Sequence, residues 1–140
     1  MSKKIKDIMS RDVEVVRPDD SLQDAAQKMR THDVGFLPVC DGQRLIGALT
    51  DRDIAIRAVA DGKDPKKMKV KDVANPAVNW CFEDQDVDDA AKMMKDKEIR
   101  RIMVIERQGK QLVGVVSVGD LATRASSKDS GSVMEKTGPK

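Results

Sequence analysis

A hydroxyl residue followed three positions later by an aspartate occurs twice, each time at the end of an apolar, strand-like run. Thr50 and Asp53 lie in GALTDRD, and Ser117 and Asp120 lie in GVVSVGD. A hydroxyl and the free amides at a helix start can bind phosphate, and a carboxylate one turn further on can accept hydrogen bonds from the hydroxyls of a ribose. The same spacing also forms a capping box, which needs no ligand. The motif alone therefore predicts either a nucleotide site or a helix start.

A glycine three residues ahead of each hydroxyl favours the nucleotide site. Gly47 and Gly114 lie within the preceding strands, where a missing side chain leaves room for a close approach. The motif contains no pair of nucleophile and base, and the chain has a single histidine, His32. With no catalytic spacing and no metal motif, we expect a site that holds a ligand without reacting with it, and a protein that is not an enzyme.

The motif recurs because the chain is an internal duplication. The segment from Ile5 aligns with the segment from Val70 without a gap, at an offset of 65 residues, and the offset becomes 67 after a longer second turn. Apolar residues in each copy fall at i, i+3, i+4 and i+7, which predicts a helix from Leu22 and another from Val87. Each copy reads as β-α-β-β-α, preceded by a short helical lead-in, so we expect an α/β (α+β) fold.

The predicted elements follow from apolar runs and turn residues. The first strand of the first copy is expected at residues 13–16, before Pro18. The next strands are expected at residues 35–40 and 45–50, and at 101–105 and 112–117 in the second copy. The second helix starts at the hydroxyl motif and is expected to end near residue 60 in the first copy and near 125 in the second.

The repeat divides the chain into four segments. Residues 1–62 form the first copy with its lead-in helix, 63–69 a lysine-rich linker, 70–126 the second copy, and 127–140 a flexible tail. The linker is expected to be a solvated connector or a contact surface for an acidic partner or phosphate. One copy is too small to stand comfortably alone. We therefore expect the copies to pack with pseudo-two-fold symmetry and to create two equivalent clefts.

Composition excludes several classes of partner. The 26 basic and 24 acidic residues give a net charge of only +2, and aromatic residues make up 2%, so neither nucleic acid nor an anionic membrane is an expected partner. No apolar run approaches a transmembrane length and no leader is visible, so we expect a cytoplasmic protein. Cys40 and Cys81 are expected to be buried, reduced thiols. A zinc site made of both cysteines and His32 is the less favoured alternative.

The whole pattern resembles a tandem pair of CBS domains (a Bateman module). The residues that carry the resemblance are VRPDDSLQDAAQKM, DVGFLPVCD and GALTDRD, and it covers about residues 5 to 125. The sequence is similar to stand-alone bacterial CBS pairs of the hypoxic-response type. The resemblance implies binding of adenosine nucleotides (AMP, ADP or ATP, or else NAD or S-adenosylmethionine) as regulatory ligands, with no required cofactor or metal. It also implies a disk-shaped homodimer.

The resemblance also assigns roles to residues of this sequence. Asp53 and Asp120 match the aspartates that bind ribose. Thr50 and Ser117 match the hydroxyl residues beside ribose and phosphate, and Arg100 and Arg101 lie where basic side chains can reach phosphate. The base pocket would be formed by the first strand and the start of the second strand of each copy, namely Val13, Glu14, Val34, Gly35, Phe36, Val78, Asn79 and Ile99.

The two copies differ in charge at this place. Arg100 and Arg101 can make charge-assisted hydrogen bonds to phosphate, whereas the first copy has Gly35 and Phe36 there, and Glu14 would repel phosphate. We therefore expect the second-copy site to bind phosphorylated ligands better. Alternatively, one arginine faces solvent and the other pairs with Glu98 or Asp96. Trp80 either stacks on the adenine or fills a cleft or a dimer face.

Two functions remain open from the sequence. The first is a non-catalytic sensor, in which a bound nucleotide rearranges the cleft or the dimer and so signals to an effector protein of unknown identity. The second is a ligand-free dimerisation scaffold, in which the motif is only a capping box. A melting experiment with and without nucleotide separates the two.

Overall fold

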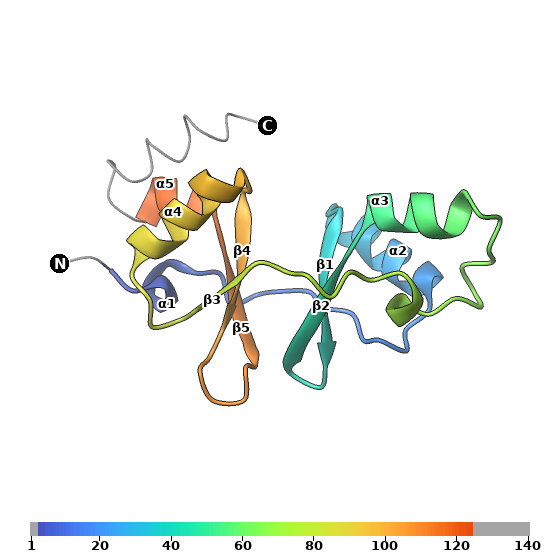
Figure 1. Cartoon of the computed structure of the whole chain (residues 1–140), viewed down its shortest axis with the longest axis horizontal. Coiled ribbons are helices and arrows are strands. Elements are labelled where there is room, and N and C mark those ends of the chain that lie inside the picture. The colour runs from blue at the N-terminus through green and yellow to red at the C-terminus, as the bar shows by residue number, and fades with distance from the viewer. Residues whose placement is uncertain (1–2, 125–140) are drawn as a thin grey trace. The chain divides into compact units, whose positions relative to one another are not determined.

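The computed structural model describes residues 3–124, which form two compact units (Figure 1). The central unit is Glu14–Val78, and the terminal unit combines Met1–Val13 with Asn79–Lys140. Within each unit, helices cover one face of the strands. The predicted mixture of helices and strands in two related units is confirmed. The predicted flexible tail, 127–140, lies outside the described residues, and the division at residues 62, 69 and 126 stays a prediction.

The helices and strands of the two units correspond closely. The central unit contains α2 (Leu22–His32), β1 (Phe36–Asp41), β2 (Arg44–Thr50), α3 (Asp51–Ile54), the π-helical stretch Ala55–Val59 and the 3-10 turn Val70–Asp72. The terminal unit contains α1 (Ile5–Ile8), β3 (Trp80–Phe82), α4 (Val87–Lys97), β4 (Arg101–Ile105), β5 (Leu112–Ser117) and α5 (Val118–Arg124). The two predicted hairpins, β1–β2 and β4–β5, both form as antiparallel pairs.

The first predicted strand forms in only one copy. In the terminal unit β3 runs parallel to β4, and the amide of Met103 donates to the carbonyl of Asn79 at 3.1 Å. The equivalent bond in the central unit would run from residue 38 to the carbonyl of Glu14, but residue 38 is proline and has no amide hydrogen. Only an isolated bridge between Val16 and Val39 remains there. The prediction of a strand at residues 13–16 is therefore wrong.

Each lead-in segment packs into the core of the unit that holds the other copy's hairpin. Ile5 and Ile8 are fully buried in the core of the terminal unit, among side chains of α4, β4 and α5. Val70 and Val73 are fully buried in the core of the central unit, with side chains of α2, β1 and β2. The two repeats along the sequence are therefore interleaved in the folded chain, an arrangement that their alignment does not reveal.

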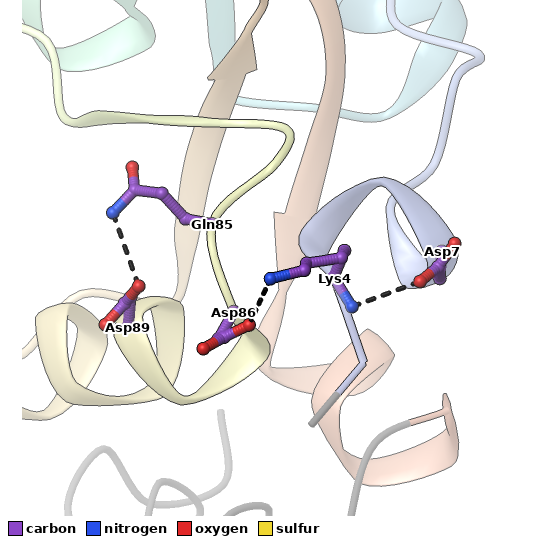
Figure 2. Close-up of polar contacts among 5 residues, drawn as sticks. All are labelled: Lys4, Asp7, Gln85, Asp86 and Asp89. Atoms are coloured by element: carbon purple, nitrogen blue, oxygen red, sulfur yellow. Dashed lines mark hydrogen bonds and ion pairs between the residues drawn. The ribbon is translucent and has the colours of Figure 1, made fainter. Parts of the chain in front are cut away.

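Hydrogen bonds and an ion pair hold the first lead-in segment against the start of α4 (Figure 2). Lys4 Nζ lies 2.8 Å from Asp86 Oδ1, and the Lys4 amide donates to Asp7 Oδ2 at 3.1 Å. The amide of Ile5 donates to the carbonyl of Gln85 at 2.9 Å. Asp86 is the residue before α4 but does not cap that helix with its side chain. Its carboxylate instead pairs with Lys4.

The lysine-rich linker is attached to the central unit through its backbone. Its lysine side chains are exposed, as expected for a solvated connector. The amide of Leu22 donates to the carbonyl of Met68 at 3.0 Å, and that of Gln23 donates to Pro65 at 3.2 Å. The segment therefore completes the first turn of α2, whose early amides have no partner within the helix.

The glycines ahead of the hydroxyl motif make room for the chain itself. A Cβ on Gly47 would lie 2.8 Å from the carbonyl oxygen of Asn75, and one on Gly114 would lie 2.7 Å from that of Ser10. These carbonyls belong to the lead-in segments, which bridge to the neighbouring residues Ala48 and Val115. The interpretation of both glycines as room for a ligand is therefore wrong, because backbone already fills that space.

Replacing Gly114 by alanine is expected to destabilise the terminal unit by about 1–3 kcal/mol, because the new methyl group collides with backbone that cannot move alone. Urea unfolding measures the change. Gly119→Ala is the matched control, since its Cβ would meet only Ser117 Oγ at 3.5 Å, an ordinary contact. Equal midpoints for the two variants would contradict this account of Gly114.

Candidate functional site

The first hydroxyl motif forms a complete capping box in the central unit. Thr50, the last residue of β2, accepts through Oγ1 from the amide of Asp53 at 3.0 Å. The amide of Thr50 donates back to Asp53 Oδ2 at 3.1 Å. Both side chains are half-buried. The box fixes the rotamer of Asp53 and leaves its Oδ1 outside the box.

The second motif forms the same box in the terminal unit, with one further bond. Ser117 Oγ accepts from the amide of Asp120 at 3.1 Å, and the Ser117 amide donates to Asp120 Oδ2 at 2.9 Å. The Ser117 hydroxyl also lies 3.1 Å from the same Oδ2. Again only Asp120 Oδ1 lies outside the box. In each copy, therefore, one carboxylate oxygen of the predicted ribose-binding aspartate is already engaged within the box.

The segment at the start of the second strand lies directly beside each motif. The amide of Asp51 donates to the carbonyl of Gly35 at 3.0 Å, and the amide of Val118 donates to that of Arg100 at 2.9 Å. Phe36 pairs with Thr50 in the first hairpin. In the second, Arg101 pairs with Ser117. The structure thus brings these predicted base-pocket and phosphate residues next to the predicted ribose residues.

A left-handed residue positions each of these segments. Asp33 and Glu98, each at φ 54°, end α2 and α4. The next amide then turns back onto the helix, so that Val34 donates to the carbonyl of Met29 and Ile99 to that of Met94, both at 3.0 Å. Val34 and Ile99 pack against the two cores. The segments are therefore anchored at one end by a helix and at the other by a strand.

The four base-pocket residues that were predicted on the first strand of each copy do not all lie in the same unit as their motif. Glu14 lies in the central unit, where its carboxylate is 3.4 Å from His32 Nε2 and 3.7 Å from Lys28 Nζ. The carbonyl of Asn79 is used by β4 in the terminal unit. Val13 belongs to the terminal unit and Val78 to the central unit, so each lies in the opposite unit from the motif with which the sequence grouped it.

The amides at the start of the helix differ between the copies. In the first copy all three first-turn amides are used, because Arg52 N donates to Asp51 Oδ1 at 2.8 Å, in addition to the bonds of Asp51 and Asp53. The expectation of free amides for phosphate is therefore wrong there. In the second copy Val118 replaces Asp51, and within residues 3–124 the Gly119 amide has no hydrogen-bond partner.

Asp51 is the residue of this region that the sequence reasoning missed. Its carboxylate lies against Gly35, since a Cβ on that glycine would be 2.7 Å from Asp51 Oδ2. The motif assigns no role to this position, although it is aspartate in the first copy and valine, Val118, in the second. The first-copy region therefore carries an additional negative charge.

Comparison with known proteins decides the family. Two segments of the chain, residues 5–59 and 70–127, match the model of the CBS domain. The chain belongs to the CBS-domain family. The hydroxyl motifs and the segments beside them thus lie at equivalent positions of two CBS domains.

Among relatives, the CBS chain is 37% identical over 118 residues to Hypoxic response protein 1 of Mycobacterium tuberculosis, covering 84% of this chain and 81% of that protein. A crystal structure of Hypoxic Response Protein I with two coordinated zinc ions superposes with a TM-score of 0.75, at 36% identity, over 87% of this chain and 98% of that one. The CBS domain pair of protein MJ0100, in complex with 5′-methylthioadenosine and S-adenosyl-L-methionine, gives a TM-score of 0.70 at 27% identity, over 87% and 94%. The predicted resemblance to the hypoxic-response type is confirmed.

The described part of this chain does not offer a donor set for zinc. Across residues 3–124, no group of three or more His, Cys, Asp or Glu side chains is placed to hold a metal ion. Cys40 and Cys81 are buried, free thiols, as predicted. Burial raises the pKa of Cys40 to about 11, and burial together with the charge of Asp89 raises that of Cys81 to about 12. Without a bound metal ion, both thiols are therefore protonated at neutral pH.

Two further features concern possible partners. Trp80 is 39% exposed and makes an edge-to-face contact with Phe82, whose ring is covered by Arg107. The Trp80 ring therefore already has one aromatic neighbour. Among the helices of residues 3–124, none is long and apolar enough to cross a membrane.

Proposed function

We propose that this CBS pair is a non-catalytic regulatory module that binds adenine nucleotides or related adenosine ligands. The observation that carries the proposal is the duplicated box. In each copy a half-buried aspartate is held rigidly by a hydroxyl residue, with one carboxylate oxygen directed away from the box. Such an oxygen can accept hydrogen bonds from ribose hydroxyls at little cost in side-chain entropy.

The neighbouring segment supports an adenosine ligand in particular. Residues 34–36 and 99–101 lie beside the box and are anchored on both sides, so their backbone can form a fixed wall for a base. The similar CBS pair of MJ0100 is described as a complex with two adenosine derivatives. We therefore take AMP, ADP and ATP as candidate ligands, with NAD and S-adenosylmethionine as alternatives, and assign no cofactor to the protein.

Regulation by a bound ligand requires a partner protein that responds to the ligand-bound module. We propose that the module forms a homodimer in the cytoplasm and acts on an effector protein, because two CBS domains account for nearly all of the residues described. A ligand can shift such a module only by binding one of its conformations more tightly than another. The alternative function, a ligand-free dimerisation scaffold, is supported by the same box, which is a complete helix cap without any ligand.

Thermal unfolding with each candidate nucleotide separates the two functions. A nucleotide present at about 100 times its dissociation constant is expected to stabilise the folded protein by about 2.7 kcal/mol. The melting temperature of the wild type should therefore rise, while that of an Asp53→Ala/Asp120→Ala double variant should not.

Ribose 5-phosphate serves as the control ligand because it lacks the base. If AMP, ADP, ATP, NAD and S-adenosylmethionine all leave the wild-type melting temperature unchanged while the protein remains dimeric, the scaffold is the correct function.

A further inference from the structure

The two copies have different side chains at one backbone contact beside the hydroxyl motif. The residue that starts the second helix donates its amide to the carbonyl of the residue just before the second strand. The bond runs from Asp51 to Gly35 in the first copy and from Val118 to Arg100 in the second. The backbone geometry is the same, but the side chains are Asp51 and Gly35 in one copy and Val118 and Arg100 in the other. The first pair therefore carries an acidic side chain, Asp51, and the second pair carries a basic one, Arg100.

Asp51 occupies the space that a side chain at position 35 would need. Its Oδ2 lies 2.7 Å from the position of a Cβ on Gly35, and its Oδ1 accepts from the Arg52 amide at 2.8 Å. The carboxylate is thus held at the junction of β2, α3 and the segment before β1. Glycine at position 35 is what allows this placement.

The balance of charge around the two motifs differs in sign. The first copy brings Asp51 and Asp53 against one cation, Arg52, and the nearby Glu14 is already paired with Lys28 and His32. At the matching positions of the second copy the sequence has Arg100, Arg101 and Asp120, with valine and glycine at positions 118 and 119. Over these five matching positions the formal charge is therefore −1 in the first copy and +1 in the second.

We propose that Asp51 determines ligand class, so that the first-copy site takes adenosine ligands without a 5′-phosphate, neutral or cationic at that end, and the second-copy site takes 5′-phosphorylated ones. This inference rests on the proposed function. A phosphate beside the Asp51 carboxylate would meet a like charge and no available first-turn amide. A neutral or cationic group would meet no such repulsion. One chain would then respond to two kinds of adenosine ligand.

The test is a titration of the full chain with AMP and with adenosine, followed by the amide signals of residues 34–36 and 99–101 in NMR spectra. These signals report the two sites separately, so no second mutation is needed. In the wild type, the first site should prefer adenosine to AMP and the second should prefer AMP. Asp51→Asn removes the charge but keeps an acceptor for the Arg52 amide, and it should raise the AMP affinity of the first site roughly tenfold with little change for adenosine.

Asp61→Asn is the matched control. Its carboxylate lies in the turn after the same helical segment, roughly 15 Å further along at 1.5 Å per residue, which is beyond a Debye length. The double variant Gly35→Arg/Asp51→Val, which installs the second-copy pair, should give the first site the AMP preference of the second. If the ratio of AMP affinity to adenosine affinity at the first site is the same in the wild type, in Asp51→Asn and in the double variant, the inference is overturned while the proposed function stays intact. Failure of the wild type to bind AMP or adenosine at either site would overturn the inference, whereas the proposed function is overturned only when the melting experiment fails with every candidate ligand.

Discussion

Replacing Asp120 by alanine is expected to lower the affinity of the second-copy site for AMP by a factor of about 10 to 100. A hydrogen bond to a charged group contributes about 1.5–3 kcal/mol, and each 1.4 kcal/mol corresponds to a tenfold change in affinity. The capping box holds Asp120 in one orientation, so its open oxygen is presented without further loss of side-chain freedom. Isothermal titration calorimetry with AMP measures the loss.

The helix cap must be separated from the ligand contact, because the same carboxylate serves both. Ser117→Ala removes the cap of the Asp120 amide but keeps the carboxylate, and cap loss alone costs about 0.5–2 kcal/mol of stability. It should therefore lower the melting temperature and should reduce the AMP affinity less than Asp120→Ala does, because the Ser117 amide still donates to Asp120 Oδ2. Asp53→Ala should cost less AMP affinity than Asp120→Ala, because the first-copy region is acidic. Equal losses from the two aspartate variants would contradict this ranking of the sites.

Replacing Ile8 by alanine is expected to destabilise the terminal unit by about 2–5 kcal/mol, although Ile8 belongs to the first repeat along the sequence. Ile8 is fully buried among residues of the terminal core, such as Leu121 and Ile102. Removing its side chain leaves a cavity in the unit that holds Ser117 and Asp120. Amide hydrogen exchange should show the lost protection in α4, β4 and β5 rather than in β1 and β2.

Two variants serve as comparisons for Ile8→Ala. Lys6→Ala changes an exposed side chain of the same short helix and should be nearly neutral. Val73→Ala removes the corresponding lead-in contact of the central unit, and its lost protection should appear in α2, β1 and β2. Loss of protection in β1 and β2 on Ile8→Ala, with the terminal unit unaffected, would disprove the interleaved packing.

Local patterns accounted for most of the elements that surround the site. Apolar spacing predicted α2 and α4, and apolar runs bounded by turn residues predicted both hairpins, because these signals are set by near neighbours in the chain. The strand predicted at residues 13–16 failed for a reason that lies elsewhere in the sequence. Pro38 cannot donate the ladder hydrogen bond that Met103 donates in the second copy.

By itself the sequence determined the duplication, the family and the pairing of a hydroxyl with an aspartate at each helix start. All three depend on residue order and short spacing, and the capping boxes form as that spacing requires. Only the tertiary structure decided what Gly47 and Gly114 accommodate, which core each lead-in segment joins, and where the Asp51 carboxylate lies. These contacts join residues far apart in the chain, and no local pattern encodes which distant backbone will approach a glycine.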